Sequence, residues 1–460
     1  MSKPYSIDMC SGSLGKKILL FALPLMAANV LQMMFNLADV VVVGKFAGDL
    51  SQAAVTSTTS MINLLLAIFM GLSGGANVVI ARALGAREHE RVEDIVHTCI
   101  TLGLVCGVGL MGIGILAAPG LLTLIKSPDN VKGLSLIYLR IYFFGVPATL
   151  VYNFASAILR ANGDTKRPMY FLILAGIINV VLNLVSVIGL GMGVAGVAIA
   201  TVASQWVSAL LTVRCLQRED GFLHLNLHRL RIRWDALGQI ARIGIPAGLQ
   251  ASMFSLSNTV IQSSINSLDA IEQYKDVVIA GSGAAITIEN ICYQISGAFF
   301  YAAMPFVSQN YGARRLKRVD RSFLWCQAYS FLCAILVSVI TVAASGTLLR
   351  LFTNDPGVVA QGQLRLRCII TFLCLGAAMD VCTATLRGMG WSVVPMVVTV
   401  VGVCGLRLLW VGTVFRADPR PENIYIAYPI TWAVTAAVHL CTILVARHRA
   451  KRKFASESLE

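Results

Sequence analysis

Four ionisable side chains interrupt long apolar runs of the sequence: Asp39, Glu289, Asp380 and Arg407. A charged side chain at the centre of a membrane-spanning helix costs about 2.5 to 3.5 kcal/mol on insertion scales, so each is a candidate for function. Asp39 is followed by four valines, and the first basic residue after it is Lys45. Because apolar surroundings disfavour the ionised carboxylate, Asp39 can exchange a proton or bind a desolvated cation.

Polar side chains that could complete an ion site at Asp39 occur later in the first half of the chain. Asn179 and Asn183 share one helix face, and Thr201 lies on the next apolar segment. Oxygen ligands of these types suit a hard cation or a hydrogen-bonded proton. The alternative is structural, with the two asparagines bridging helices and Asp39 hydrogen-bonded among them.

The other three charges lie in the second half of the chain. Glu289 and Asp380 supply two acids, and Arg407 is a base in a later apolar run. A buried ion pair is a frequent structural device, so we expect one of the acids to neutralise Arg407, in preference to contact between Arg407 and a substrate.

The elements that must position these residues are membrane helices. The chain has 460 residues, of which 57% are hydrophobic and 13% charged, with a mean hydropathy of +0.74. Such a composition predicts an integral membrane protein. Twelve apolar runs are long enough to cross a bilayer. They begin near Ile18, Ala54, Ile95, Leu134, Met169, Val194, Ile240, Val277, Phe323, Leu364, Val393 and Tyr425.

The second half of the chain repeats the first. Pairs of matching segments lie 227 residues apart, such as Gly85-Ala86-Arg87 with Gly312-Ala313-Arg314, and Leu159-Arg160 with Leu386-Arg387. Near the start of each half the offset is 222, which pairs Pro24 with Pro246 and Asn36 with Asn258. An internal duplication in an apolar chain is typical of transporters.

Six spans per copy place both copies in the membrane with the same orientation. The predicted fold is therefore an all-α polytopic protein of twelve transmembrane helices in two lobes, residues 1–222 and 223–460. A pseudo-two-fold axis along the membrane normal would relate the lobes. Pro24 and Pro246 each remove a backbone hydrogen bond from the first helix of a lobe, so we expect a bend at each.

Lys and Arg gather in alternate loops, which predicts a multi-pass protein of the cell inner membrane with both termini in the cytoplasm. The net charge of +14 is dispersed over many short loops, so it favours contact with the lipid bilayer over nucleic-acid binding. The sequence contains no His-Glu-x-x-His motif and no paired acids at catalytic spacing, so no enzyme activity is expected. No cofactor and no obligate protein partner is indicated.

Together these features resemble the multidrug and toxic compound extrusion (MATE) family, over about residues 14–447. The marks of the resemblance are Ala22-Leu23-Pro24, Asp39 to Gly44, Ala83 to Ala86, Leu159 to Asp164, and Asn179 to Asn183 followed by Gly193 to Thr201. The resemblance implies an antiporter that exports small organic, often cationic, compounds by alternating access, driven by inward proton or sodium flow. It also implies an ion-coupling role for Asp39, Asn179 and Thr201, and a place in the substrate cavity for Gln32 and Asn153. Asn36 lies on the same helix as Gln32 and is included in the predicted cavity.

The chain departs from the family pattern at two positions. Many relatives carry a second acid where this chain has Asn183, and another branch has an acid at the position of Phe254. A lone carboxylate favours a proton over sodium, although a sodium ion at the Asp39 site stays open, as does a separate sodium site at the second-lobe acids. The alternative function is a flippase for a lipid-linked sugar or another amphipathic metabolite. Such a protein would need several cationic residues within its spans, and the sequence indicates mainly Arg407.

Overall fold

The computed structural model describes residues 5–124 and 128–456, and all regular secondary structure within these ranges is helical. The residues divide into two compact units by their contacts. Unit 1 comprises residues 1–8 and 27–248, and unit 2 comprises residues 9–26 and 249–460. Two long helices, α1 (Leu14–Phe46) and α8 (Trp234–Ser267), therefore belong partly to each unit.

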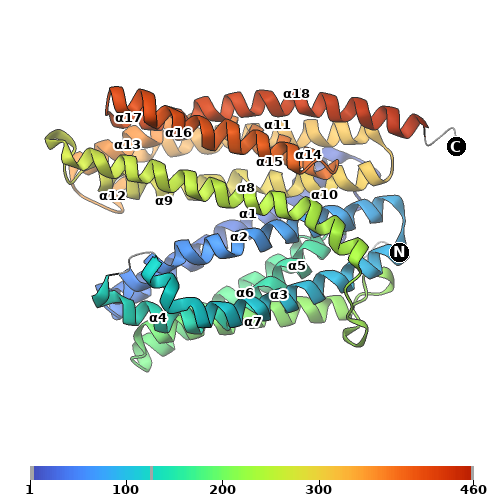
Figure 1. Ribbon diagram of the computed structural model, residues 1–460, viewed down its shortest axis with the longest axis horizontal. Coiled ribbons are helices and arrows are strands. Elements are labelled where there is room, and N and C mark those ends of the chain that lie inside the picture. The colour runs from blue at the N-terminus through green and yellow to red at the C-terminus, as the bar shows by residue number, and fades with distance from the viewer. Residues whose placement is uncertain (1–4, 125–127, 457–460) are drawn as a thin grey trace. The chain divides into compact units, whose positions relative to one another are not determined.

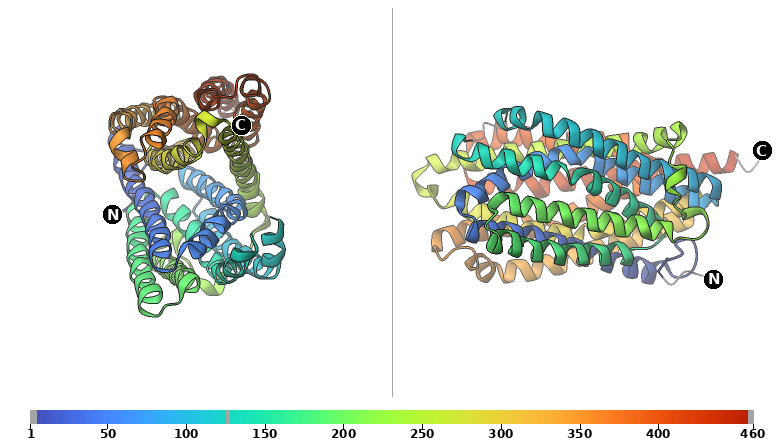
Figure 2. Two further views of the ribbon diagram at one scale, coloured as in Figure 1. Left: turned by 90° about the vertical axis from the view of Figure 1, so that its left-hand side faces the viewer. Right: turned by 90° about the horizontal axis from the view of Figure 1, so that it is seen from below.

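Unit 1 is otherwise built from six α-helices and one π-helical segment. These are α2 (Asp49–Ala86), α3 (His89–Leu124), α4 (Asp129–Phe143), α5 (Val146–Ala161), α6 (Lys166–Asn183), the π-helix η1 (Leu184–Gly189) and α7 (Gly193–Gln217). Within this unit α3 packs on α5, α6 on α7 and α5 on α7 (Figures 1 and 2).

Unit 2 contains the remaining helices. They are α9 (Val278–Ser296), α10 (Ala298–Gly312), α11 (Leu316–Ala343), α12 (Ser345–Arg350), α13 (Pro356–Ile370), α14 (Leu373–Gly388), α15 (Val393–Thr399), the π-helix η6 (Val400–Gly405), α16 (Leu406–Trp410), the π-helix η7 (Val411–Phe415), α17 (Pro421–Tyr425) and α18 (Ala427–Ser456). Figure 1 shows α18 running beside α15 and α16. Short 3₁₀ turns at Gly221–Leu223, Leu227–Arg229, Leu268–Ala270 and Glu272–Tyr274 complete the described structure.

Nine helical segments of the described residues are long and apolar enough to cross a membrane. The number is eleven when two bent pairs, α4 with α5 (46°) and α13 with α14 (44°), each count as one span. The remaining run of the twelve predicted is α8, a 34-residue helix that is less apolar because it carries serine, asparagine and glutamine side chains. The prediction of an all-helical polytopic membrane protein is confirmed.

Most of the helices begin earlier than the apolar runs that predicted them. The clearest case is α13, which begins at Pro356, eight residues before the predicted start at Leu364. Its first turn is capped by Asp355, whose carboxylate accepts hydrogen bonds from the backbone N–H groups of Gly357 (2.7 Å) and Val358 (3.2 Å). This longer helix takes Arg365 into its interior.

The segment after α7 is held on unit 1, although the predicted lobe boundary lies at residue 222. Asn226 donates its backbone N–H to His97 Nε2 (3.2 Å), and Arg233 donates its backbone N–H to Thr98 Oγ1 (3.1 Å). Arg231 forms an ion pair with Asp94. Residues 223–248 therefore pack with unit 1, while residues 9–26 pack with unit 2.

Candidate functional site

The accessible face of α1 in unit 1 carries three polar side chains. Gln32, Asn36 and Asp39 follow one another at intervals of four and three residues, so they share a helix face. Gln32 and Asn36 are exposed, and Asp39 is half-buried. Gln32 and Asn36 on this face are therefore accessible, and the Asp39 carboxylate on the same face is less accessible.

Asp39 is joined to the three oxygen-bearing side chains that the sequence predicted. Asn183 Nδ2 donates a hydrogen bond to Asp39 Oδ1 and lies 3.4 Å from Asn179 Oδ1. Asn179 Nδ2 in turn donates to Thr201 Oγ1 (3.5 Å). Both asparagines are buried, at 5% and 1% exposure. The structure therefore brings together α1, α6 and α7 through one continuous chain of polar groups, which we call the Asp39 cluster.

The Asp39 cluster can form because α1 and α6 approach each other closely. Gly176 on α6 lies against Phe35 on α1, and a Cβ atom at residue 176 would be 1.8 Å from the Phe35 ring. Phe35 is one turn before Asp39, and Gly176 is one turn before Asn179. The missing side chain at Gly176 therefore lets Asp39 reach the asparagines.

The backbone changes type directly after the cluster. The α-helical geometry of α6 ends at Asn183 and continues as the π-helix η1. Single π-helical turns are uncommon and occur frequently at functional sites. Asn183 Oδ1 is buried here without a hydrogen-bond partner among the described residues. An unpaired buried amide oxygen costs about 1 to 3 kcal/mol, which a bound cation or a protonated Asp39 would relieve.

The donor set of the Asp39 cluster is one carboxylate, two amides and one hydroxyl. These are groups that bind a proton or a hard monovalent cation through oxygen, and they include no sulfur or imidazole for a transition metal. Thr201 Oγ1 already donates to Val197 O (2.9 Å), so its lone pairs remain directed toward the asparagines.

Asn153, the third residue of the predicted substrate cavity, is not part of this cluster. It lies half-buried on α5, and its Nδ2 donates to the backbone oxygen of Thr149 (2.9 Å) on the same helix. No hydrogen bond joins it to Asp39, Asn179 or Asn183 in the described residues.

The prediction that Arg407 forms an ion pair with Glu289 or Asp380 is wrong. Glu289 instead accepts two hydrogen bonds from Arg365, from Nε to Oε1 (2.7 Å) and from Nη2 to Oε2 (3.0 Å). Arg365 also donates from Nη1 to Ser282 Oγ (2.9 Å). Both charged residues are buried, so this bidentate pair occupies the carboxylate fully. Arg365 lies inside α13, whose true start the apolar run did not reveal.

The hydrogen-bonding partners of Arg407 are neutral. Its Nη1 donates to Asn258 Oδ1 (3.2 Å), and its Nε lies 3.4 Å from Thr431 Oγ1. The guanidinium carbon is 4.0 Å from the centre of the Tyr428 ring and 5.5 Å from that of Phe254. Arg407 is 1% exposed, and no ion pair joins it to a carboxylate of the described residues.

Asp380 differs from the other predicted second-lobe charges because it is exposed. It interacts electrostatically with Arg387, seven residues later on the same helix α14. Arg387 is itself buried and donates from Nη2 to Gln250 Oε1 (2.8 Å). Sequence reasoning missed both Arg365 and Arg387, because neither lies deep within a predicted apolar run. The Asp355-Pro356 capping signal could have revealed Arg365 as an interior residue.

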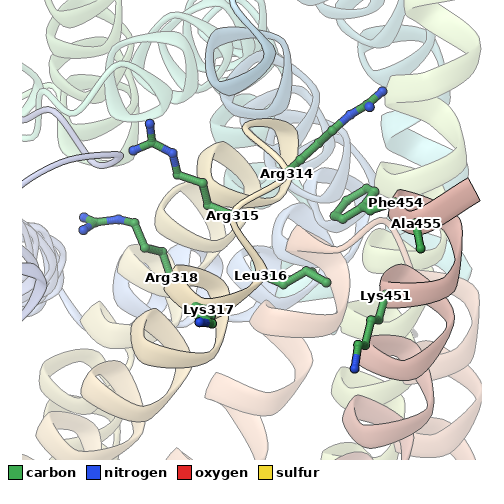
Figure 3. A pocket seen from close by; sticks show the side chains of 8 residues that line it. All are labelled: Arg314, Arg315, Leu316, Lys317, Arg318, Lys451, Phe454 and Ala455. Atoms are coloured by element: carbon green, nitrogen blue, oxygen red, sulfur yellow. The ribbon is translucent and has the colours of Figure 1, made fainter. Parts of the chain in front are cut away.

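A basic hollow of about 550 Å³ lies between the α10–α11 turn and the end of α18 in unit 2. Figure 3 shows that its charged groups do not converge, because Arg315 and Arg318 point to one side and Arg314 to another. Arg315 donates to Cys10 O (2.6 Å) and Arg318 to Ser11 O (3.0 Å). These arginines hold the segment before α1 on unit 2.

Comparison with known proteins agrees with the predicted family. The family model described as MatE matches residues 24–185 and 246–410, so its two segments begin at Pro24 and Pro246, the paired prolines of the repeat. The "Probable multidrug resistance protein YoeA" of Bacillus subtilis (strain 168) is 27% identical over 92% of this chain and 92% of its own. The "FAD transporter" of Shewanella oneidensis is 24% identical over 76% of this chain and 77% of its own.

The fold is also that of a solved structure. The "Outward-facing conformation of a multidrug resistance MATE family transporter of the MOP superfamily" covers 98% of this chain and 99% of its own, with a TM-score of 0.88 and 22% identity. A family model that matches both repeats over most of the chain is decisive, and the helical fold agrees with it. The chain therefore belongs to the MATE family of multidrug efflux transporters.

Proposed function

We propose that this transporter is an antiporter that couples inward flow of a proton or a sodium ion to export of small organic, often cationic, compounds. The observation that supports this most directly is the Asp39 cluster, in which a single carboxylate is held by Asn183 beside an accessible polar helix face. Asp39, Asn179, Asn183 and Thr201 are the proposed coupling residues, and Gln32, Asn36 and Asn153 the proposed cavity residues.

The proposed coupling step is neutralisation of Asp39. An ionised Asp39 accepts a hydrogen bond from Asn183 Nδ2, whereas a protonated Asp39 can donate to the unpaired Asn183 Oδ1. Binding of the cation therefore changes the hydrogen bonding between α1 and α6, the contact that sets the position of α1. One charge moving down a potential of 100 mV supplies about 2.3 kcal/mol for export.

A proton is the favoured coupling ion, because one carboxylate becomes neutral when it binds one proton. A sodium ion would depend on the neutral oxygens of Asn183 and Thr201 beside Asp39. In this proposal the protein lies in the cell inner membrane with both termini in the cytoplasm, and lobes 1–222 and 223–460 open the cavity alternately to either side.

The test is transport of a fluorescent organic cation into inside-out proteoliposomes under a proton gradient or a sodium gradient, imposed separately. We expect one gradient to drive uptake by the wild type, and Asp39→Asn to abolish it. Asp129→Asn, at an exposed position at the start of α4, is the matched control and should transport normally. Gradient-driven uptake by a folded Asp39→Asn protein at the wild-type rate would refute the proposed coupling.

A flippase or exporter of an amphipathic anionic metabolite is the second candidate function. It is favoured by the buried cations Arg387 and Arg407 in unit 2 and by the similarity to a protein named as an FAD transporter. Proteoliposomes loaded with a flavin dinucleotide distinguish the candidates, since only this second function predicts its movement in exchange for the ion.

A further inference from the structure

Arg407 is a buried cation whose charge is not balanced by the protein around it. The ion pair of Glu289 with Arg365 in the same unit is already neutral, and both oxygens of Glu289 are used. A guanidinium does not lose its proton in proteins, so Arg407 stays charged when it is buried. Contact with the ring of Tyr428 stabilises the cation, but an aromatic ring supplies no counter-charge.

The hydrogen bonding of Arg407 is incomplete in the same place. Nη1 has Asn258 and Nε has Thr431, whereas Nη2 is buried without a partner among the described residues. Buried polar groups normally find partners, so an unpaired guanidinium nitrogen indicates a partner that binds there. Adjacent Nη1 and Nη2 donors are the geometry that recognises carboxylate or phosphate oxygens.

Two further observations indicate that Arg407 lies at a functional position. It lies on the five-residue helix α16, between the π-helices η6 and η7, just as the Asp39 cluster adjoins η1. Its partner Asn258 is exposed on α8 and is the repeat counterpart of Asn36, one of the proposed cavity residues. Arg407 thus lies directly behind an accessible polar side chain.

We propose that Arg407, with Asn258 and the ring of Tyr428, is a binding site in unit 2 for the carboxylate or phosphate group of an exported compound. The proposed compound has an aromatic or apolar body beside this anionic group, since Phe254 and Tyr428 flank the guanidinium. That the bound anion belongs to an exported compound rests on the proposed export function. That Arg407 binds an anion does not depend on it.

The test is equilibrium binding to the full-length protein in nanodiscs, measured by fluorescence anisotropy with two matched probes. Pyrenebutyrate carries a carboxylate, and pyrenebutanol is its neutral analogue. We expect the wild type to bind the carboxylate more tightly, and Arg407→Gln to weaken only that binding, by about tenfold to a hundredfold. Arg416→Gln, at an exposed position at the end of the same helical stretch, is the control and should change neither affinity.

Each outcome decides the proposal. Equal wild-type affinity for the two probes, or an undiminished preference for the carboxylate in folded Arg407→Gln, would overturn the site. If Arg407→Gln does not fold, Arg407→Lys keeps the charge but loses the paired donors, and should reduce the preference for pyrenebutyrate. Chloride that displaces pyrenebutyrate only when Arg407 is present, at physiological concentration, would assign the site to an inorganic anion and overturn the role of an exported compound. The binding assay involves no ion gradient, so its failure leaves the Asp39 coupling test unaffected.

Discussion

At the scale of single residues, the two units hold their buried charges in different ways. Glu289 and Arg365 form a bidentate pair with Ser282 as a third partner, which satisfies both charges. Asp39 accepts a hydrogen bond from the amide of Asn183, and no cationic side chain of the described residues pairs with it. The first arrangement stabilises the fold, and the second leaves a charge that can be neutralised during a transport cycle.

The Glu289–Arg365 pair makes a prediction about stability. Glu289→Gln should lower the free energy of unfolding by about 3 to 5 kcal/mol, because Arg365 remains buried without its counter-charge. The double variant Glu289→Leu with Arg365→Met should recover most of this loss, since it removes both charges. Unfolding in mixed detergent micelles, followed by tryptophan fluorescence, measures both effects. Glu272→Gln, at an exposed site, is the control, and a double variant no more stable than the single one would contradict the pair's structural role.

At the scale of elements, helix contacts and backbone type decide where polar groups meet. The helix α1 comes close to α6 only because residue 176 has no side chain. The π-helices follow Asn183 in unit 1 and flank Arg407 in unit 2. In both units a change of helical pitch therefore lies beside the buried polar group that we assign to ion or anion binding.

The contact between Phe35 and Gly176 can be tested by adding a side chain at residue 176. Gly176→Ala should cost about 1 to 3 kcal/mol of stability and lower gradient-driven transport, since the added methyl group forces α1 away from the asparagines. Adding Phe35→Leu to this variant should restore part of the stability and part of the transport, because leucine is smaller than phenylalanine. The measurements are detergent unfolding and proteoliposome uptake. Gly189→Ala, where an added Cβ meets no atom within 4 Å, should be silent, and an equally silent Gly176→Ala would show that this contact does not position Asp39.

At the scale of the whole molecule, the chain passes from one unit to the other within two helices. The boundary between the units falls between Met26 and Ala27 in α1 and between Gly248 and Leu249 in α8. Each boundary follows shortly after the proline of its helix, Pro24 or Pro246. Both helices continue through their prolines, where a backbone hydrogen bond is missing. The bends expected at these prolines remain a prediction, and because the crossings lie beside them we propose that they have a role in transport.

Pro24→Ala tests that role. The substitution restores a helical hydrogen bond, so we expect the free energy of unfolding to stay equal or rise, by at most about 3 kcal/mol, while the maximum transport rate falls. Substrate affinity should change little. Pro119→Ala, within α3 and entirely inside unit 1, is the matched control and should transport at the wild-type rate. A Pro24→Ala protein with an unchanged rate would show that α1 need not bend.

The sequence by itself determined the helical membrane fold and the residues of the Asp39 cluster. The length of an apolar run and the need to satisfy every backbone group in lipid are local properties, so spans can be read along the chain. Asn179 and Asn183 share a face by helical period, and the family resemblance assigned Asp39, Asn179 and Thr201 to one ion-coupling site.

Only the tertiary structure decided which buried charges are paired. Glu289 and Arg365 are 76 residues apart and on different helices, and nothing in their local sequence distinguishes Arg365 from Arg407 as the partner. Likewise, residues 9–26 and 223–248 pack with units that their sequence positions do not predict. The physical reason is that ion pairing and lobe packing depend on how helices are rotated and placed against one another, which apolar length and period do not specify.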